Sequence, residues 1–157
     1  MFRVNCIVEP HYPVKTKLIK TTVTKVLDLL KVKGNTEVTV SIVGDRKMRT
    51  LNRQFAETDA TTDVLSFSQT EQLIGSSGFL VNPEDSYLDL GDIVISYPQT
   101  INNAIKDEVL VDQSVQKLLI HGILHLLGYD HATPADKMMM DKFQEQIYKE
   151  VALQEQS

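Results

Sequence analysis

The sequence predicts a single α+β domain that spans residues 1–157. Short segments in which apolar and polar residues alternate, as they do in strands, are interspersed with segments in which apolar residues recur at helical spacing. A length of 157 residues is typical of one domain, and an apolar fraction of 42% is sufficient for a substantial core. The chain contains no internal repeat and no linker-like segment that would divide it.

Four strands are expected, over residues 3–8, 38–42, 63–68 and 88–96. In the second of these, Val38, Val40 and Ile42 alternate with Thr39 and Ser41, which is the pattern of a strand with one buried face. Residues 69–86 are rich in glycine and serine, and we expect them to form a long exposed loop or hairpin.

Two helices are expected in the first third of the chain. From Val14 onward, apolar residues follow near-helical spacing until Gly34, where the pattern stops. Asp45 can cap a second, shorter helix that would direct Met48, Leu51 and Phe55 inward.

Three more helices are expected after the fourth strand. Pro98 suits the first turn of one helix, and Asp112 or Ser114 can begin an apolar helix that ends at Gly128. The segment from Thr133 to Asp136 resembles a capping box and would open the last helix.

Charge is distributed unevenly along the chain. Through Arg53 there are eleven Lys and Arg against four Asp and Glu, whereas the remainder is strongly acidic and the net charge is −5. A pI near 5.3 argues against broad, undirected binding of nucleic acid. Arg46, Lys47 and Arg49 are candidates for an RNA-binding surface, and a solvated helix face explains the same charges equally well.

Cysteine content and hydropathy indicate a cytoplasmic protein. Cys6 is the only cysteine, so an intrachain disulfide and a cysteine-based zinc ribbon are both excluded. No apolar run approaches the ~20 residues that a membrane helix needs, and the first residues lack the pattern of a signal peptide. We therefore expect no membrane association.

Three of the four histidines lie within eleven residues and carry the strongest functional signal. His121 and His125 are four residues apart, which is about 400° of rotation, so they stack on one face of a helix. The turn after Gly128 can fold His131 toward the same point. Three neutral imidazoles with a fourth position left for water are typical of a catalytic zinc site with one Zn²⁺ per chain.

The alternative is that these histidines are hydrogen-bonded core residues without a shared task. Burying three rings so close together would then leave several ring nitrogens in need of separate partners, and the metal interpretation is favoured for that reason. His11 lies apart, beside prolines, and is interpreted as a loop residue.

The residue that follows His121 bears on whether the protein is a peptidase. Zinc proteases with two helical histidines place a glutamate directly after the first one as general base, and here that position is Gly122. Asp130 is the nearest acid, and it can either cap the turn or hold a histidine ring by an outer hydrogen bond. A peptidase is therefore the weaker interpretation.

Motifs along most of the chain resemble those of the YbeY-type endoribonucleases, the bacterial rRNA maturation factors. The motif that starts at His121 and ends with Gly-Tyr-Asp-His131 resembles the metal motif of the family. Further similar motifs follow in the order of the family: Leu51-Asn52, Thr62-Asp63-Val64-Leu65-Ser66-Phe67 and Leu90-Gly91-Asp92-Ile93.

The resemblance implies a single-strand-specific endoribonuclease that acts in rRNA maturation and ribosome quality control, with RNA on the ribosomal subunit as partner and no role for DNA. It also implies one zinc held by the three histidines, and a small mixed sheet flanked by helices with the metal in a cleft between them. The chemistry would be metal-assisted phosphodiester hydrolysis.

One departure from the family concerns an arginine thought to contact phosphate. The family has Tyr-Arg before the Thr-Asp-Val-Leu-Ser-Phe motif, and this chain has Phe55-Ala56. Arg53 lies about one helical turn earlier and is a candidate substitute, in which case Arg53→Ala would lower cleavage far more than Arg49→Ala. Two alternatives stay open: a ribosome-assembly factor with a structural zinc, and a zinc hydrolase of another substrate.

Overall fold

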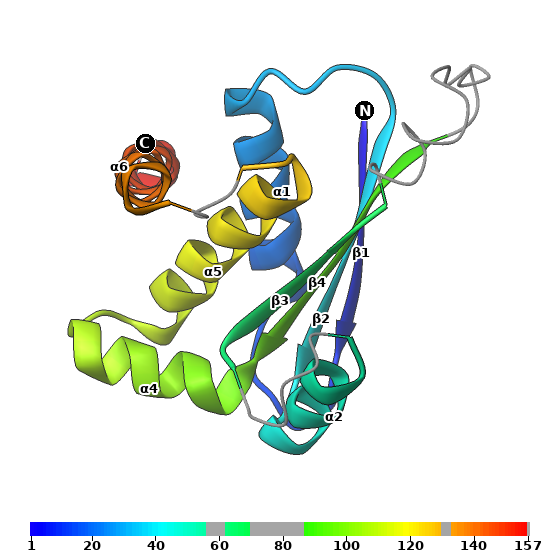
Figure 1. The fold of residues 1–157 in the computed structure, drawn as a ribbon, viewed down its shortest axis with the longest axis vertical. Coiled ribbons are helices and arrows are strands. Elements are labelled where there is room, and N and C mark those ends of the chain that lie inside the picture. The colour runs from blue at the N-terminus through cyan, green and yellow to red at the C-terminus, as the bar shows by residue number, and fades with distance from the viewer. Residues whose placement is uncertain (56–61, 70–86, 130–132, 157) are drawn as a thin grey trace.

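A four-stranded sheet forms the centre of the computed structural model, which describes residues 1–55, 62–69, 87–129 and 133–156 (Figure 1). The strands are β1 (Phe2–Val8), β2 (Thr36–Val43), β3 (Val64–Ser68) and β4 (Leu88–Ser96). The helices of the described residues are α1 (Thr16–Leu29), α2 (Asp45–Phe55), α4 (Tyr97–Asp107), α5 (Val111–Leu126) and α6 (Pro134–Gln156). The expected α+β class is confirmed, whereas most of the expected loop over 69–86 lies outside the described residues.

The sheet is mixed and has the order β1-β2-β4-β3. β1, β2 and β4 run parallel, and β3 lies antiparallel to β4 at the edge. The register pairs Val40 of β2 with Ile93 of β4, and Phe67 of β3 with Asp92 of β4. The motifs around Thr62 and Leu90 that resemble one family are thereby placed on neighbouring strands.

The two faces of the sheet carry different helices, because successive side chains of a strand point to opposite sides. Ile93 and Ile95 of β4 pack into the core beneath α1 and α5. Val94, which lies between them, packs instead with Met48 of α2. The expectation that Phe55 at the end of α2 also faces inward is wrong, because its side chain is 64% exposed. In Figure 1 the sheet is seen nearly edge-on, with α1 and α5 on one side and α2 on the other.

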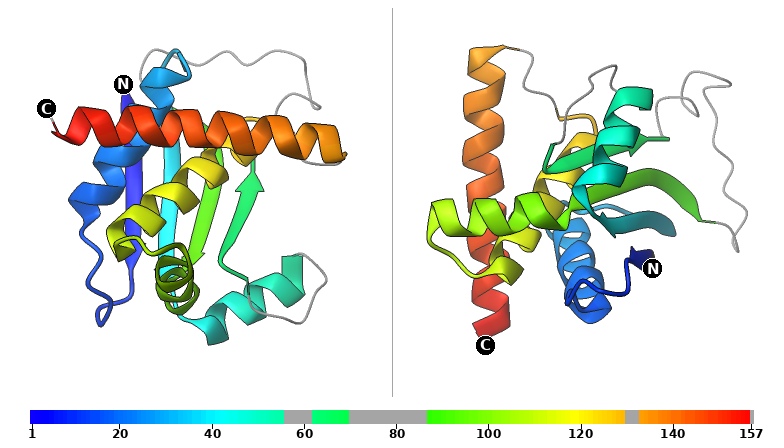
Figure 2. Two further views of the ribbon diagram at one scale, coloured as in Figure 1. Left: turned by 90° about the vertical axis from the view of Figure 1, so that its left-hand side faces the viewer. Right: turned by 90° about the horizontal axis from the view of Figure 1, so that it is seen from below.

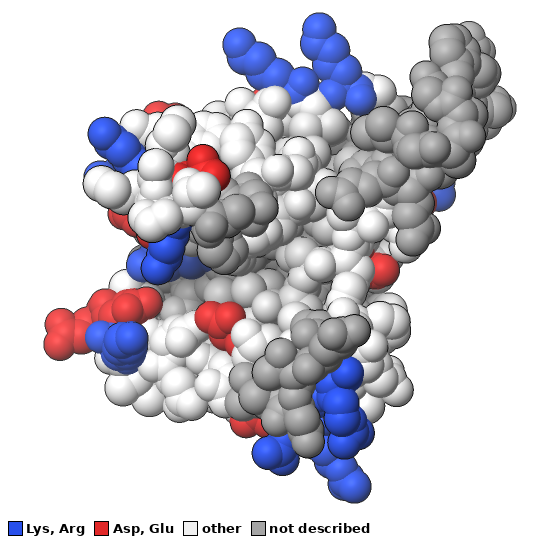
Figure 3. Space-filling model, in the orientation of Figure 1, with Lys and Arg blue, Asp and Glu red and all other residues white. Residues whose placement is uncertain are grey.

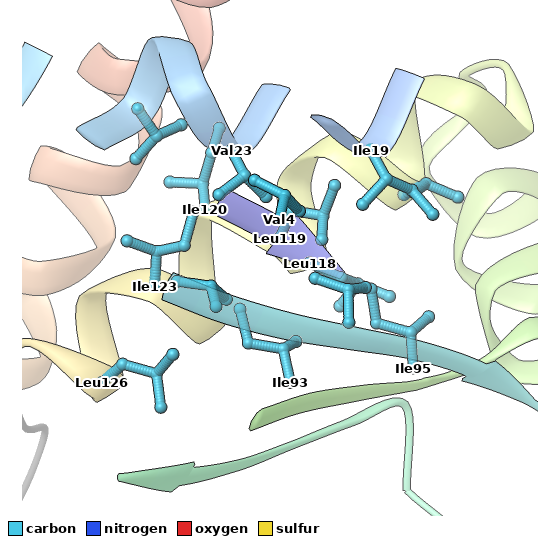
Figure 4. Close-up of a cluster of buried hydrophobic side chains, with 14 of the residues drawn as sticks. Val4, Ile19, Val23, Ile93, Ile95, Leu118, Leu119, Ile120, Ile123 and Leu126 are labelled. Carbon is cyan, nitrogen blue, oxygen red and sulfur yellow. The ribbon is translucent and has the colours of Figure 1, made fainter. Parts of the chain in front are cut away.

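The larger core is formed between the sheet and the helices α1 and α5. Ile19 and Val23 of α1 meet Leu119 and Ile123 of α5 over Ile93, as Figure 4 shows. All five side chains are fully buried. Each such burial contributes roughly 1.5–3 kcal/mol to stability, so the orientation of α5 is firmly fixed.

α6 forms an outer layer that crosses α1 and α5 on the side away from the sheet (Figure 2). Met140, Ile147 and Val151 are its buried residues toward the core. At its start, the Asp136 amide donates to Thr133 Oγ1 at 3.1 Å, so Thr133 caps the helix as the sequence predicts. No helix in the described ranges is both long and apolar enough to span a membrane.

Candidate metal centre

Two imidazoles of α5 meet one helical turn apart on the same side of the helix. The rings of His121 and His125 have their centroids 4.5 Å apart and are inclined at 64°. Their Nε2 atoms are 3.0 Å from each other, and both residues are half-buried. The predicted pairing of these two histidines one turn apart is therefore present in the structure.

Gln144 of α6 forms a hydrogen bond with the ring of His121. Its Oε1 atom lies 3.0 Å from His121 Nδ1. Because an amide oxygen can only accept, the Nδ1 atom carries the proton and donates this hydrogen bond. The neutral ring then presents the lone pair of Nε2 toward His125, and this tautomer is the one that a metal bound at Nε2 requires.

The geometry of the pair fits a shared cation. Two nitrogen ligands of a tetrahedral zinc, each at ~2.0–2.1 Å, lie about 3.3 Å from each other, close to the 3.0 Å that separates the two Nε2 atoms. Without a cation, the same contact requires a proton on one of the two Nε2 atoms. Metal-binding histidines usually donate a hydrogen bond from their other ring nitrogen to an acceptor that orients the ring, as His121 Nδ1 does to Gln144 Oε1.

The third predicted ligand, His131, and the neighbouring Asp130 lie outside the described residues. Among the residues that the structure does describe, no third histidine, cysteine or carboxylate joins the pair to complete a metal-binding group. His11, interpreted as a loop residue, lies in the turn after β1 with its ring 4.1 Å from that of Tyr12.

Gly122 occupies the position where a metalloprotease carries glutamate, and packing explains why a side chain is absent there. A Cβ atom on Gly122 would lie 2.9 Å from Ile93 Cγ2, inside the contact between α5 and β4. The glycine therefore lets the helix approach the sheet closely. A carboxylate at this position would point into the core rather than toward the imidazoles.

Side chains of β3 attach the edge of the sheet to the same helix. Ser66 Oγ donates to the Gly122 carbonyl and Ser68 Oγ to the Leu126 carbonyl, each at 3.4 Å. Both serines belong to the half-buried strand that follows the Thr62-Asp63 motif. Thus β3 flanks the histidine-bearing helix along the length that contains His125.

The basic residues that are candidates for RNA binding lie away from the histidine pair. Arg46, Lys47, Arg49 and Arg53 are exposed residues of α2, on the opposite face of the sheet from α5. Figure 3 shows Lys and Arg side chains gathered at the lower end of the molecule, where α2 lies. The structure therefore does not bring Arg53 to the histidine pair, and Ala56 falls outside the described residues.

The face of the sheet beneath α2 contains a cavity of about 600 Å³ that includes Lys47, Phe55, Phe67 and Asp92 in its wall. Burial raises the pKa of the Asp92 carboxyl above its ordinary value of 3.8, and the nearby Asp89 adds to this rise. Lys47 is the one basic candidate that lines this cavity.

The fold and the two converging imidazoles place the chain among small α+β proteins that carry a histidine site on a central helix. The profile of the family described as Endoribonuclease YbeY matches residues 9–152. The chain therefore belongs to the YbeY family.

Relatives and a solved structure agree with this assignment. The Endoribonuclease YbeY of Dehalococcoides mccartyi is 34% identical over 154 residues, which cover 94% of this chain and 89% of the relative. That of Neorickettsia sennetsu is 29% identical and covers 94% and 95%, respectively. The solution structure of TM1509 from Thermotoga maritima is similar with a TM-score of 0.59 and 27% identity, over 96% of this chain and 89% of that one.

Sequence reasoning missed two polar residues at the site. Gln144 is an ordinary polar residue of a long helix, 23 positions from the histidine that it contacts, and no motif marks it. Ser66 belongs to a recognised motif, but its bond to the Gly122 carbonyl depends on how β3 meets α5.

Proposed function

We propose that this protein is a zinc-dependent, single-strand-specific endoribonuclease that acts in rRNA maturation and ribosome quality control in the cytoplasm. The observation that carries the proposal is the convergence of two Nε2 atoms at 3.0 Å, with Gln144 fixing the tautomer of one ring. Membership of the YbeY family, whose relatives are named endoribonucleases, supports the choice of RNA as substrate.

The ligands in this proposal are His121, His125 and His131, with one Zn²⁺ per chain. A zinc ion at such a site supplies a Lewis acid for a phosphoryl oxygen and lowers the pKa of water toward ~7. The chain's own contribution is to hold neutral imidazoles, which leave the cation's charge uncompensated, so that an anionic phosphodiester is attracted.

The hydrolysis itself consumes one water molecule for each phosphodiester. The oxygen of water forms a new bond to phosphorus, and the bond from phosphorus to the leaving ribose oxygen breaks. The protons of water end on the leaving oxygen and on solvent. No carboxylate follows His121 on the helix, since Gly122 packs against Ile93.

A second candidate is a ribosome-assembly factor in which zinc is structural. Two observations favour it: Ala56 replaces the family arginine, and Arg53, its candidate substitute, lies on the opposite face of the sheet. In this case zinc would contribute directly to stability, and RNA would be bound without being cut. A zinc hydrolase of another substrate is the remaining alternative.

Metal removal and replacement distinguish these candidates. The protein is stripped of metal with a chelator, and Zn²⁺ is then restored before cleavage of single-stranded and duplex RNA is followed together with thermal unfolding. The nuclease proposal predicts that cleavage of the single strand disappears and returns with zinc. A fall in melting temperature without any cleavage in either state favours the assembly factor, and metal-dependent turnover of an ester or peptide alone favours another hydrolase.

A further inference from the structure

The cavity beneath α2 lies on the face of the sheet opposite to the histidine-bearing helix (Figure 1). Its volume of about 600 Å³ is within the range of pockets that hold small ligands. α2 contributes Lys47, Leu51 and Phe55 to its wall, and the sheet contributes Phe67 and Asp92. Leu51, Phe67 and Asp92 each belong to a motif that resembles those of the YbeY family, and none of the three is part of the histidine site.

Two phenylalanine rings form an aromatic wall in this cavity. The ring centroids of Phe55 and Phe67 are 5.2 Å apart, and the rings are inclined at 63°. Phe67 is half-buried, whereas Phe55 is 64% exposed. An exposed ring at the mouth of a cavity is a surface on which the plane of an unpaired nucleic-acid base can stack.

The same side of α2 carries an ammonium group. Lys47, Leu51 and Phe55 are spaced four residues apart, so they lie along one side of the helix. A single strand that stacks a base on Phe55 and runs toward the start of α2 would therefore bring a phosphate to Lys47.

The net charge of α2 favours an RNA strand over a basic peptide as the occupant. The helix carries one acid, Asp45, and four cations, which are Arg46, Lys47, Arg49 and Arg53. Asp45 Oδ1 already accepts hydrogen bonds from Ser96 Oγ at 2.9 Å and from Gln99 Nε2 at 3.1 Å. This helix therefore attracts phosphate groups and repels a cationic partner.

Asp92 supplies a hydrogen-bond acceptor in the cavity wall. It lies directly opposite Phe67 in the pairing of β3 with β4, so its side chain is next to the aromatic wall. Its half-buried carboxyl has no hydrogen-bond or ion-pair partner among the described residues. Every RNA base carries an N–H donor on its Watson–Crick edge, and unstacked bases of single strands are read through such edges. A carboxylate at this place suits a base edge and would repel a phosphate.

We propose that this cavity is a second RNA site, which binds one unpaired nucleotide of the substrate strand away from the histidine pair. The base stacks on Phe55 and donates to Asp92, and a neighbouring phosphate contacts Lys47. The proposal rests on the proposed function for the choice of RNA, and it adds a site that strengthens binding of the strand without taking part in cleavage.

The edge strand β3 lies between the two sites. Its Ser66 and Ser68 hydroxyls donate to carbonyls of α5, whereas Phe67, which lies between them, lines the cavity on the other face. β3 is the last strand in the order of the sheet. A single strand that passes over this edge can therefore reach the cavity and the histidine-bearing helix together.

The RNA affinity of Phe55 variants tests the proposal. Binding of fluorescein-labelled dodecaadenylate is followed by fluorescence anisotropy in the full chain that carries His125→Ala, so that cleavage does not intervene. Adding Phe55→Ala should weaken binding about tenfold, because the stacking of a base on the ring is lost. Phe55→Tyr keeps the ring and should bind as tightly as the parent, whereas Phe55→Leu should lose as much as Phe55→Ala. Ile105→Ala removes a similarly exposed apolar side chain from α4 and is the matched control, with unchanged affinity expected.

Thermal unfolding and a basic peptide complete this test. Because Phe55 is largely exposed, Phe55→Ala should melt close to the parent, so weaker binding is not a consequence of unfolding. Equal RNA affinity in Phe55→Ala and the parent overturns the proposal, and so does an equal loss in Phe55→Tyr and Phe55→Ala. Binding of nona-arginine that is tighter than that of RNA, and is lost in Phe55→Ala, overturns the choice of RNA as occupant.

Cleavage kinetics separate the second RNA site from the proposed function. With His125 present, Phe55→Ala should raise KM for dodecaadenylate about tenfold and leave kcat within about twofold, because it removes binding that is equal in the ground and transition states. If the wild type cuts no RNA but Phe55→Ala weakens binding and Phe55→Tyr restores it, the nuclease proposal fails and the second site stands. If the wild type cuts RNA and Phe55→Ala has the same KM and affinity, the second site fails and the nuclease stands.

Discussion

Replacing Gln144 with leucine tests whether its hydrogen bond to His121 raises the affinity of the histidine pair for a metal. In the wild type, Gln144 Oε1 accepts from His121 Nδ1 at 3.0 Å, and a leucine of similar size cannot accept. The ring loses this partner, and the tautomer that protonates Nε2 becomes more populated. Loss of such a contact typically lowers metal affinity about 10–100-fold, which corresponds to about 1.4–2.7 kcal/mol.

Competition with a chromogenic zinc chelator measures this effect without any assay of catalysis. Gln144→Glu should bind zinc at least as tightly as the wild type, because a carboxylate still accepts from Nδ1. Gln146→Leu is the matched control, since Gln146 is an exposed residue of the same helix, and it should change affinity by no more than about twofold. Equal affinities for Gln144→Leu and the wild type would refute the role of this hydrogen bond.

Three further predictions concern the fold and the surface. Gly91→Ala should cost about 3 kcal/mol or more in urea unfolding, because φ is +128° and a Cβ atom would lie 2.0 Å from the Phe67 carbonyl oxygen. Gly34→Ala, at φ +86° with open space around it, should cost only about 1–2 kcal/mol, and equal losses would contradict this reasoning. The raised pKa of Asp92 means that the folded state holds its proton more tightly than the unfolded chain, so stability falls as pH rises above 3.8. Asp92→Asn should therefore raise the melting temperature at pH 7 but not at pH 3, and an equal rise at both would disprove the assignment. If α2 contacts RNA, alanine at Arg46, Lys47 and Arg49 together should reduce the slope of log affinity against log salt by about 2, and an unchanged slope would exclude this helix.

Local sequence signals anticipated the elements well where a residue has one conformational role. Gly128 was expected to end α5 and has φ +95°, and Pro98 lies in the first turn of α4, which Ser96 caps. The start of α5 was harder to place: it begins at Val111, just before the expected Asp112 or Ser114. Here the Leu110 amide donates to Gln113 Oε1 at 2.9 Å, so a side chain inside the helix caps it and no capping residue precedes it.

Pairing between distant segments could not be predicted from local pattern. The alternation in residues 38–42 predicts a strand but contains nothing that selects β1 and β4 as its neighbours. The same limit applies to the site. The spacing of His121 and His125 is a property of one helix and is confirmed, whereas the contact with Gln144 depends on how α6 packs on α5. The separation of Arg53 from the histidines likewise follows from the position of α2 on the other face of the sheet.

The central claim is that the imidazoles of α5 carry metal-dependent cleavage of RNA. The most direct measurement compares the wild type with His125→Ala, purified side by side and incubated with the same single-stranded RNA, because a trace contaminating nuclease would then act in both preparations. Zinc content and thermal unfolding of both proteins are recorded in the same experiment. We predict that the wild type cuts the RNA and that the folded His125→Ala variant binds less zinc and does not cut. Equal cleavage by the two proteins would contradict the account.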